Sequence, residues 1–130
     1  MKIYVADAIA FFYYLLDKLP RAADQAFREA ERGEAVIYLP TIAAAELLYL
    51  FERKGWLDKW HELLRLVKEL PCFTLYPFDE DVLRELEDIR LRELHDRIIV
   101  ATTRVARAKA LITKDKEIVG SGIVNTLWHS

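Results

Sequence analysis

One segment near the C-terminus limits the possible folds of this chain more than any other. Between Leu94 and Ile118 the sequence holds an acid, an apolar run of helical length, a short apolar run and a second acid. A helix that is apolar on nearly all sides is buried, and Lys109–Thr113 favours a short buried strand. Asp96 stands where a capping or first-turn carboxylate is expected. Asp115 follows the strand, and open α/β sheets bind ligands outside the carboxyl ends of their strands.

Short β-rich runs alternate with helical patterns along the whole chain. We expect strands at Lys2–Ala6, Ala35–Leu39, Cys72–Tyr76, Lys109–Thr113 and, at an edge, Ile123–Leu127. We expect helices at Ala8–Leu16, Arg21–Arg32, Ile42–Lys54, Trp56–Leu70, Asp79–Leu91 and along the apolar run after Asp96. This alternation is typical of a mostly parallel sheet with helices on both faces. With no repeat and no linker, residues 1–130 are expected to form one α/β domain of about five strands.

Composition excludes several classes of protein. Hydrophobic residues make up 53% of the chain, which argues against disorder. The longest apolar run, Ala8–Leu16, is far shorter than the roughly 20 residues of a membrane span, so no membrane association is expected. The first residues enter a strand pattern without a secretory signal, and a single cysteine, Cys72, cannot form an internal disulfide. We therefore expect a cytoplasmic protein.

Two acids stand among apolar neighbours. Asp7 ends the first strand directly before the nine-residue apolar run, where it either caps the following helix or belongs to a site. Glu46 interrupts an apolar helix, and its neighbours one turn away are apolar or aromatic. A lone buried carboxylate there would need a partner or a cation. The alternative is that Glu46 lies on the water-facing edge of its helix.

Parallel strands bring their carboxyl ends to one edge, so acids distant in sequence can converge there. The acids expected at this edge are Asp7, Glu46, Asp96 and Asp115. Carboxylates that share a cleft raise one another's pKa, and a hard divalent cation, Mg²⁺ or Mn²⁺, removes that repulsion. Zinc is disfavoured because the three histidines and one cysteine are scattered. Thr113 alternates with Asp115 along the strand, so its hydroxyl can orient a carboxylate or a metal-bound water; otherwise it is an ordinary β-branched strand residue.

Basic residues are concentrated around the two C-terminal acids, although the formal net charge is −2. Between Arg90 and Glu117 there are eight basic and four acidic residues. A basic surface beside an acidic cluster suits a polyanion that approaches a metal. The candidates nearest the acids for binding the phosphates of such a polyanion are Arg97, Lys114 and Lys116. The alternative is a solvated helix face with ion pairs.

The sequence resembles the PIN-domain ribonucleases, and among them the VapC toxins of VapBC toxin–antitoxin pairs. The resemblance covers nearly the whole chain, through Val5-Ala6-Asp7, Pro40-Thr41 before Glu46, Leu94 to Ala101, and Leu111 to Asp115. It implies a three-layer α/β/α fold, a Mg²⁺ or Mn²⁺ site, cleavage of RNA, a homodimer and inhibition by a small VapB-like antitoxin. Asp7, Glu46, Asp96 and Asp115 match the four acids of the family, and Thr113 matches the hydroxyl residue before the last one. Two departures are Ala8, where many relatives carry a hydroxyl or Asn, and Glu117, where many carry Asp.

The expected function is metal-assisted hydrolysis of RNA phosphodiesters. In this hypothesis Asp7, Asp96 and Glu46 hold one cation, while Asp115 completes the set or helps to hold a second. Two alternatives remain within the same fold: a catalytically silent binding module, and an RNA-processing nuclease without an antitoxin. A phosphoryl-accepting receiver domain matches less well, because it needs adjacent acids after strand one and an acceptor Asp ending strand three. Ala8 and Tyr76-Pro77 occupy those places.

Overall fold

A parallel sheet of five strands runs through the middle of the molecule. The computed structural model describes residues 1–129, and in them the strands are β1 Lys2–Ala6, β2 Ala35–Pro40, β3 Phe73–Tyr76, β4 Ala110–Ile112 and β5 Thr126–Leu127. The strand order is β3-β2-β1-β4-β5, with every neighbouring pair parallel. The connections are the helices α1 Ala8–Leu15, α2 Arg21–Glu31, α3 Thr41–Lys54, α4 Leu57–Glu69, α5 Glu80–Glu85, η1 Leu86–Asp88, α6 Leu94–Val105 and α7 Lys116–Ser121.

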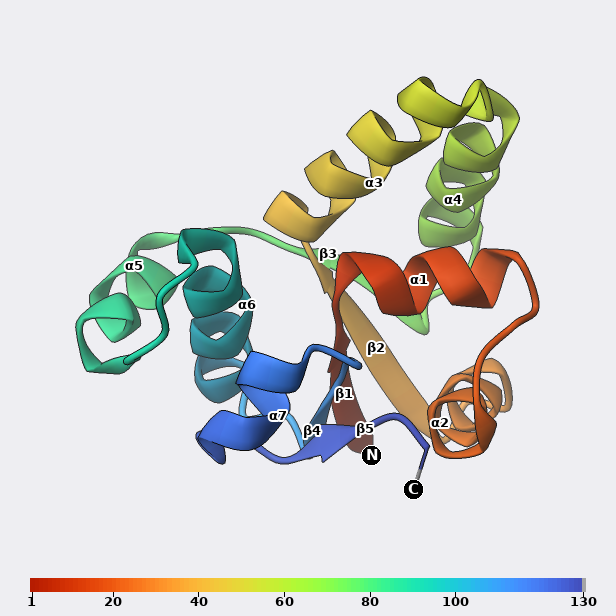
Figure 1. Cartoon of the computed structure of the whole chain (residues 1–130). Helices are drawn as coiled ribbons and strands as arrows, with labels where there is room; N and C mark the ends of the chain where they lie inside the picture. Colours follow the sequence, from red (N-terminus) through yellow and green to blue (C-terminus); the bar gives the residue numbers. More distant parts are fainter. Residues whose placement is uncertain (130) are drawn as a thin grey trace.

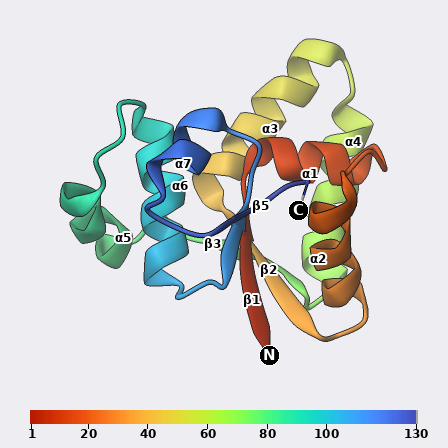
Figure 2. The same cartoon turned by 60° about the horizontal axis from the view of Figure 1, so that its bottom comes forward.

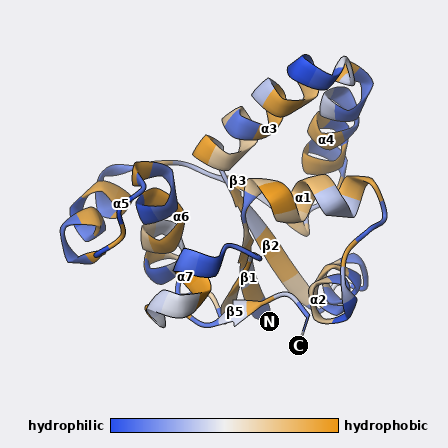
Figure 3. Ribbon diagram, viewed as in Figure 1, coloured by the Kyte–Doolittle hydropathy of each residue, from blue (hydrophilic) through white to orange (hydrophobic). Residues whose placement is uncertain are grey.

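Helices cover both faces of this sheet. Figures 1 and 2 show α5, α6 and α7 on one side of the strands and α1, α2 and α4 on the other, while α3 rises from the carboxyl edge. The central strand β2 is largely apolar and the turn between α3 and α4 is polar (Figure 3), as expected for a strand covered on both faces. The expected three-layer α/β/α architecture is confirmed.

The end of β1 lies at the point where the chain stops adding strands on one side of the sheet and begins to add them on the other. The chain moves from β1 outward through β2 to β3, then returns to the other side of β1 to form β4. Ala6 pairs with Ile112, and the Asp7 amide donates to the Ile112 carbonyl at 3.3 Å. Such reversals open a crevice at the carboxyl edge where open α/β sheets bind ligands, and Asp7 lies in it.

An aromatic cluster fixes α1 against the sheet. Phe11 meets Phe27 of α2 and Phe73 of β3 edge-on, with ring centroids 5.2 and 5.6 Å apart. All three rings are fully buried, so the packing of two helices and a strand depends on Phe11. This packing holds the N-terminus of α1 directly over the end of β1, where Asp7 makes the connection.

Two helical segments differ from the sequence-based expectation. The helix expected over Asp79–Leu91 ends at Glu85, continues as the 3₁₀ turn η1 and gives way to extended chain at Ile89, which is buried. The short helix α7 was not expected at all. Among the described residues, none of the helices combines the length and hydrophobicity needed to cross a membrane.

Candidate active site

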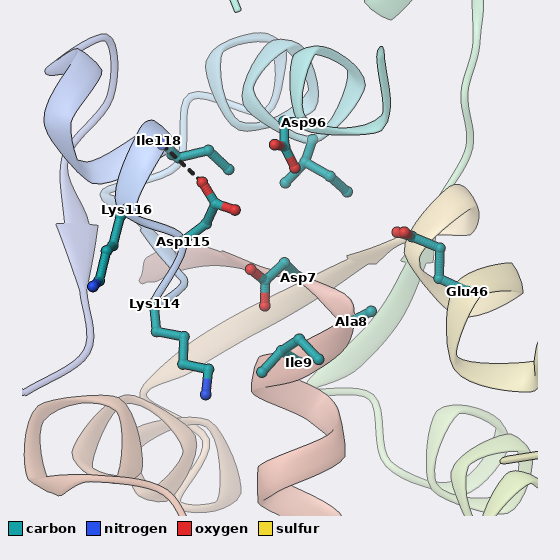
Figure 4. Close-up of a pocket in the computed structure, with 10 residues that line it drawn as sticks. Asp7, Ala8, Ile9, Glu46, Asp96, Lys114, Asp115, Lys116 and Ile118 are labelled. Atoms are coloured by element: carbon teal, nitrogen blue, oxygen red, sulfur yellow. Dashed lines mark hydrogen bonds between the residues drawn. The ribbon is translucent and has the colours of Figure 1, made fainter. Parts of the chain in front are cut away.

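A pocket of about 460 Å³ lies at the carboxyl edge of the sheet, beside the ends of β1 and β4. The structure brings all four expected acids to its wall: Asp7, Glu46, Asp96 and Asp115. Figure 4 shows that they come from different elements, with Asp115 and Glu46 on opposite walls. Apolar side chains, including Ile9, Ile99 and Ile118, also line the pocket. The pocket therefore joins acidic groups from segments more than 100 residues apart.

Asp7 and Asp115 are helix caps as well as pocket residues. Asp7 Oδ1 accepts a hydrogen bond from the Ala10 amide at 2.9 Å and begins α1. Asp115 Oδ1 accepts from the Ile118 amide at 3.0 Å and begins α7. Each cap uses one carboxylate oxygen, which leaves the second oxygen of each residue for the pocket. Capping therefore does not exclude either acid from a role in the pocket.

Thr113 connects these two caps. It is fully buried at the end of β4, and its Oγ1 accepts a hydrogen bond from the Asp115 amide at 3.1 Å. Its hydroxyl also stabilises the charged form of the Asp7 carboxyl. Because the register sets Ile112 beside Ala6, the next residues of the two strands, Thr113 and Asp7, lie side by side. Thr113 therefore lies beside both acids, and its role in orienting their carboxylates stays a prediction.

Asp96 and Glu46 reach the pocket from helices. Asp96 is the third residue of α6, whose N-cap is Glu93 rather than Asp96 itself. Glu46 lies in the second turn of α3. Its Oε2 is 3.2 Å from Nδ1 of His95, a contact that the sequence did not reveal. In the sequence, the placement of His95 near the site was indicated by its position directly before Asp96.

Burial and crowding raise the pKa of two of the acids. Burial raises the pKa of Asp7 to about 6, with Asp115 and Glu46 adding to the rise and hydrogen bonds from Thr113 and Ala10 opposing it. Burial likewise raises the pKa of Asp96 to about 6, with further contributions from Asp115, Glu93, Glu117 and Glu46. Asp115 and Glu46 each act on both groups, so the four acids influence one another electrostatically. Carboxylates in this state favour a cation.

The donor groups fit Mg²⁺ or Mn²⁺ better than a softer metal. The pocket offers carboxylate oxygens and neither a thiolate nor an imidazole, and oxygen ligands suit these hard cations. Among residues 1–129, no three His, Cys, Asp or Glu side chains are close enough together to hold an ion. Mg²⁺ commonly binds through one or two carboxylates, with waters and substrate phosphates as its other ligands. The pocket therefore has the chemistry for the ion without forming a closed protein cage.

Two of the three basic candidates lie at this pocket. Lys114 and Lys116 line it, and Figure 4 shows both extending along the side opposite Glu46. Arg97 does not line the pocket. Its Nη2 donates to the Leu86 carbonyl at 2.7 Å and its Nε is buried without a hydrogen-bond partner. Arg97 therefore joins α6 to η1, and the expectation that it binds RNA has no support from its position.

Comparison with known proteins agrees with this fold. A model of the PIN domain matches residues 4–119, whereas no curated protein matches the sequence. Among solved structures, VapBC2 from Rickettsia felis bound to a promoter DNA fragment has a TM-score of 0.75 at 15% identity, over 97% of this chain and 98% of that chain. FitAcB from Neisseria gonorrhoeae has a TM-score of 0.69 at 21% identity, over 95% and 96% of the two chains.

A third similar structure is VapC20 from Mycobacterium tuberculosis, described as a Sarcin-Ricin loop cleaving toxin. Its TM-score is 0.67 at 13% identity, over 93% of this chain and 95% of that chain. At these identities the likeness concerns the fold, and it extends over almost the full length of both chains. Because the family model also spans most of the sequence, the chain belongs to the PIN domain family.

Proposed function

We propose that this protein is a metal-dependent endoribonuclease that hydrolyses RNA phosphodiesters. The observation that carries the proposal is the pocket at the end of β1, where four acids line one hollow and two of them have a pKa near 6. Lys114 and Lys116 at its rim supply positive charge for a phosphate backbone. An acidic hollow bordered by basic side chains suits a polyanion that reaches a cation.

The side chains of the pocket have separable roles in this reaction. Asp7, Asp96, Asp115 and Glu46 would hold Mg²⁺ or Mn²⁺, which when bound polarises a phosphate and lowers the pKa of water. Thr113 keeps Asp7 and Asp115 in place through its hydroxyl. His95 holds Glu46 at the pocket wall. The isoleucines place apolar surface beside the carboxylates, which strengthens the attraction of these groups for a cation.

We also propose that the nuclease is the toxin of a toxin–antitoxin pair. Support comes from the fold, which it shares over nearly full length with VapBC2 of Rickettsia felis and with a toxin–antitoxin complex from Klebsiella pneumoniae. A small VapB-like antitoxin and a homodimer follow from this proposal. The neighbouring reading frame tests it: a small upstream gene with a basic DNA-binding start favours a toxin, whereas a solitary gene favours RNA processing.

Cleavage of RNA in the presence of Mn²⁺, with and without EDTA, tests the catalytic proposal. Asp96→Asn removes a pocket charge but preserves side-chain size, so we expect a loss of at least about a hundredfold in cleavage rate. The matched control is Asp58→Asn, which alters an exposed acid at the start of α4 and should leave the rate unchanged. Full activity in EDTA would refute the metal requirement.

A second candidate function is a PIN-like binding module without catalysis. The observation in its favour is that no three potential ligands among residues 1–129 already form a metal cluster. Ala8, in place of a hydroxyl or amide, also removes one polar group beside the first acid. Isothermal titration with Mn²⁺ separates the two candidates, since the module predicts no binding that depends on Asp96 and no RNA cleavage.

A further inference from the structure

A second pocket adjoins the acidic one and shares two lysines with it. This aromatic pocket, as we call it, measures about 580 Å³ and lies beside the C-terminal segment, lined by Thr113, Lys114, Lys116, Val119, Gly120 and Trp128 among others. Lys114 and Lys116 also line the acidic pocket. Lys114 and Lys116 therefore border both pockets, which places the two side by side along the loop between β4 and α7.

The wall of the aromatic pocket combines an indole ring with a cation. Trp128 is half-buried and packs against Tyr13, with ring centroids 5.5 Å apart and planes inclined at 56°. The Tyr13 hydroxyl accepts a hydrogen bond from Lys114 Nζ at 2.8 Å, which places that ammonium 4.7 Å from the Tyr13 ring centre. Because Lys114 is bonded there to a neutral phenol, the bond does not cancel its charge.

The backbone around Trp128 is held from two sides. The Thr113 amide donates to the Leu127 carbonyl at 3.1 Å, which fixes the end of β5 to the end of β4. The Ala23 amide, in the first turn of α2, donates to the Trp128 carbonyl at 3.1 Å. An aromatic side chain on a fixed backbone loses little conformational freedom when another ring stacks on it, which favours binding.

We propose that the aromatic pocket binds one nucleobase of single-stranded RNA, stacked against Trp128, while Lys114 and Lys116 contact the adjoining phosphates. This inference rests on the proposed nuclease function and names the part of the substrate that lies next to the cleaved bond. Aromatic rings combined with a basic groove are the usual means of binding single strands. The shared lysines and the adjacent acidic pocket favour a polyanion here over an apolar peptide.

Stacking in this pocket would fix the register of the strand. A base seated against Trp128 sets which phosphate reaches the carboxylates, because the two pockets meet at the same two lysines. Stacking tolerates any base, so the subsite selects unpaired nucleotides rather than a particular sequence. Single strands or loops would therefore be cut in preference to duplexes.

Tryptophan fluorescence gives a direct test in the full-length protein. The background is Asp96→Asn, to prevent cleavage, with Trp56→Phe and Trp60→Phe, so that Trp128 is the one remaining indole. An oligoribonucleotide just long enough to fill both pockets should quench its emission, and moving a single abasic site along it should abolish quenching at one position. In Asp96→Asn alone, adding Trp128→Ala should weaken binding about tenfold to a hundredfold, whereas Trp128→Phe should retain most of the affinity. Trp56→Ala, at an exposed ring between α3 and α4, is the matched control and should leave affinity unchanged.

The outcomes separate this inference from the proposed function. If the protein binds and cleaves RNA but no abasic position matters and Trp128→Ala binds normally, the subsite is refuted and the nuclease stands. If the wild-type protein neither binds nor cleaves RNA, both are refuted. The abasic series uses no change at Trp128, so it decides the question even if Trp128→Ala fails to fold.

Discussion

At the scale of single residues, Asp7 and Asp115 show that one carboxylate can both cap a helix and line the pocket. In Asp7 and in Asp115, one carboxylate oxygen accepts a hydrogen bond at a helix N-terminus, where the helix dipole also favours negative charge. Replacement by Asn keeps an acceptor for the cap and removes the charge. Such variants therefore separate folding from catalysis, which replacement by Ala would not.

Substitution of Thr113 tests which groups set the pKa of Asp7. Thr113→Val keeps the buried shape but removes the hydroxyl, so the Asp115 amide loses its acceptor and the charged form of Asp7 loses a donor. We expect the pKa of Asp7 to rise further, and the acid limb of the pH–rate profile for RNA cleavage to move upward by about one pH unit. Thr113→Ser should restore the wild-type profile. An unchanged profile in Thr113→Val would contradict this role.

Arg97 and Lys116 should respond to substitution in opposite ways. Arg97→Ala leaves the Leu86 carbonyl without its donor, so we expect a loss of about 1–3 kcal/mol in the free energy of unfolding and no change in RNA affinity. Lys116→Ala should weaken RNA binding and lower its salt dependence by about one charge, with little effect on stability. Urea unfolding and binding titrations at several salt concentrations measure both. A weaker salt dependence in Arg97→Ala would restore its assignment to RNA.

At the scale of elements, the parallel strands were predictable and the short helices were not. Alternating strand and helix patterns place Asp7 and Asp115 at one edge, which is a consequence of parallel pairing alone. The helical periodicity continues through Asp79–Leu91, so it did not predict that α5 ends at Glu85. A signal for the earlier end was present, because the negative charges of Glu87 and Asp88 are unfavourable at a helix C-terminus. The six residues of α7 contain Gly120, which weakens a helical pattern. Side-chain contacts between elements, such as Glu46 with His95, depend on packing that no local pattern encodes.

Two glycines of this short helix make a matched pair. Gly120 lies within α7, and a Cβ there would meet nothing within 4 Å, so Gly120→Ala should raise the free energy of unfolding by about 0.5–1 kcal/mol. Gly122 ends the helix with a φ of +66°, a conformation that costs an L-residue about 1 kcal/mol. Gly122→Ala should therefore destabilise the protein. Chemical denaturation of both variants measures the difference, and equal effects would show that α7 does not form.

At the scale of the whole molecule, the four acids predict that stability depends on cations. They come from the ends of β1 and β4 and from α3 and α6, so an ion bound among them would link segments from residue 7 to residue 115. A ligand that binds only the folded state stabilises it by mass action. Without the ion, mutual repulsion and burial act against folding at neutral pH, as the raised pKa values of Asp7 and Asp96 indicate.

The raised pKa values of Asp7 and Asp96 make the free energy of unfolding depend on pH. A carboxyl whose pKa is about 6 when folded and 3.8 when unfolded binds more protons in the native state between those values. Its contribution to the free energy of unfolding therefore falls as pH rises from about 4 to about 6. Glu29, whose pKa is lowered by its hydrogen bond with Lys2, acts in the opposite direction, so the comparison must be between wild type and Asp7→Asn.

Thermal unfolding in EDTA and in Mg²⁺, at pH 4.5 and pH 7, measures this balance. In EDTA we expect Asp7→Asn to gain stability relative to wild type as pH rises, because the variant has no charge to bury at that position. In Mg²⁺ at pH 7 the wild type should recover the difference, since the ion binds ionised carboxylates and displaces their protons. At pH 4.5 Mg²⁺ should have little effect on either protein. Equal responses of the two proteins to Mg²⁺ at pH 7 would show that Asp7 takes no part in binding the ion, and the proposal that it is a ligand would fail.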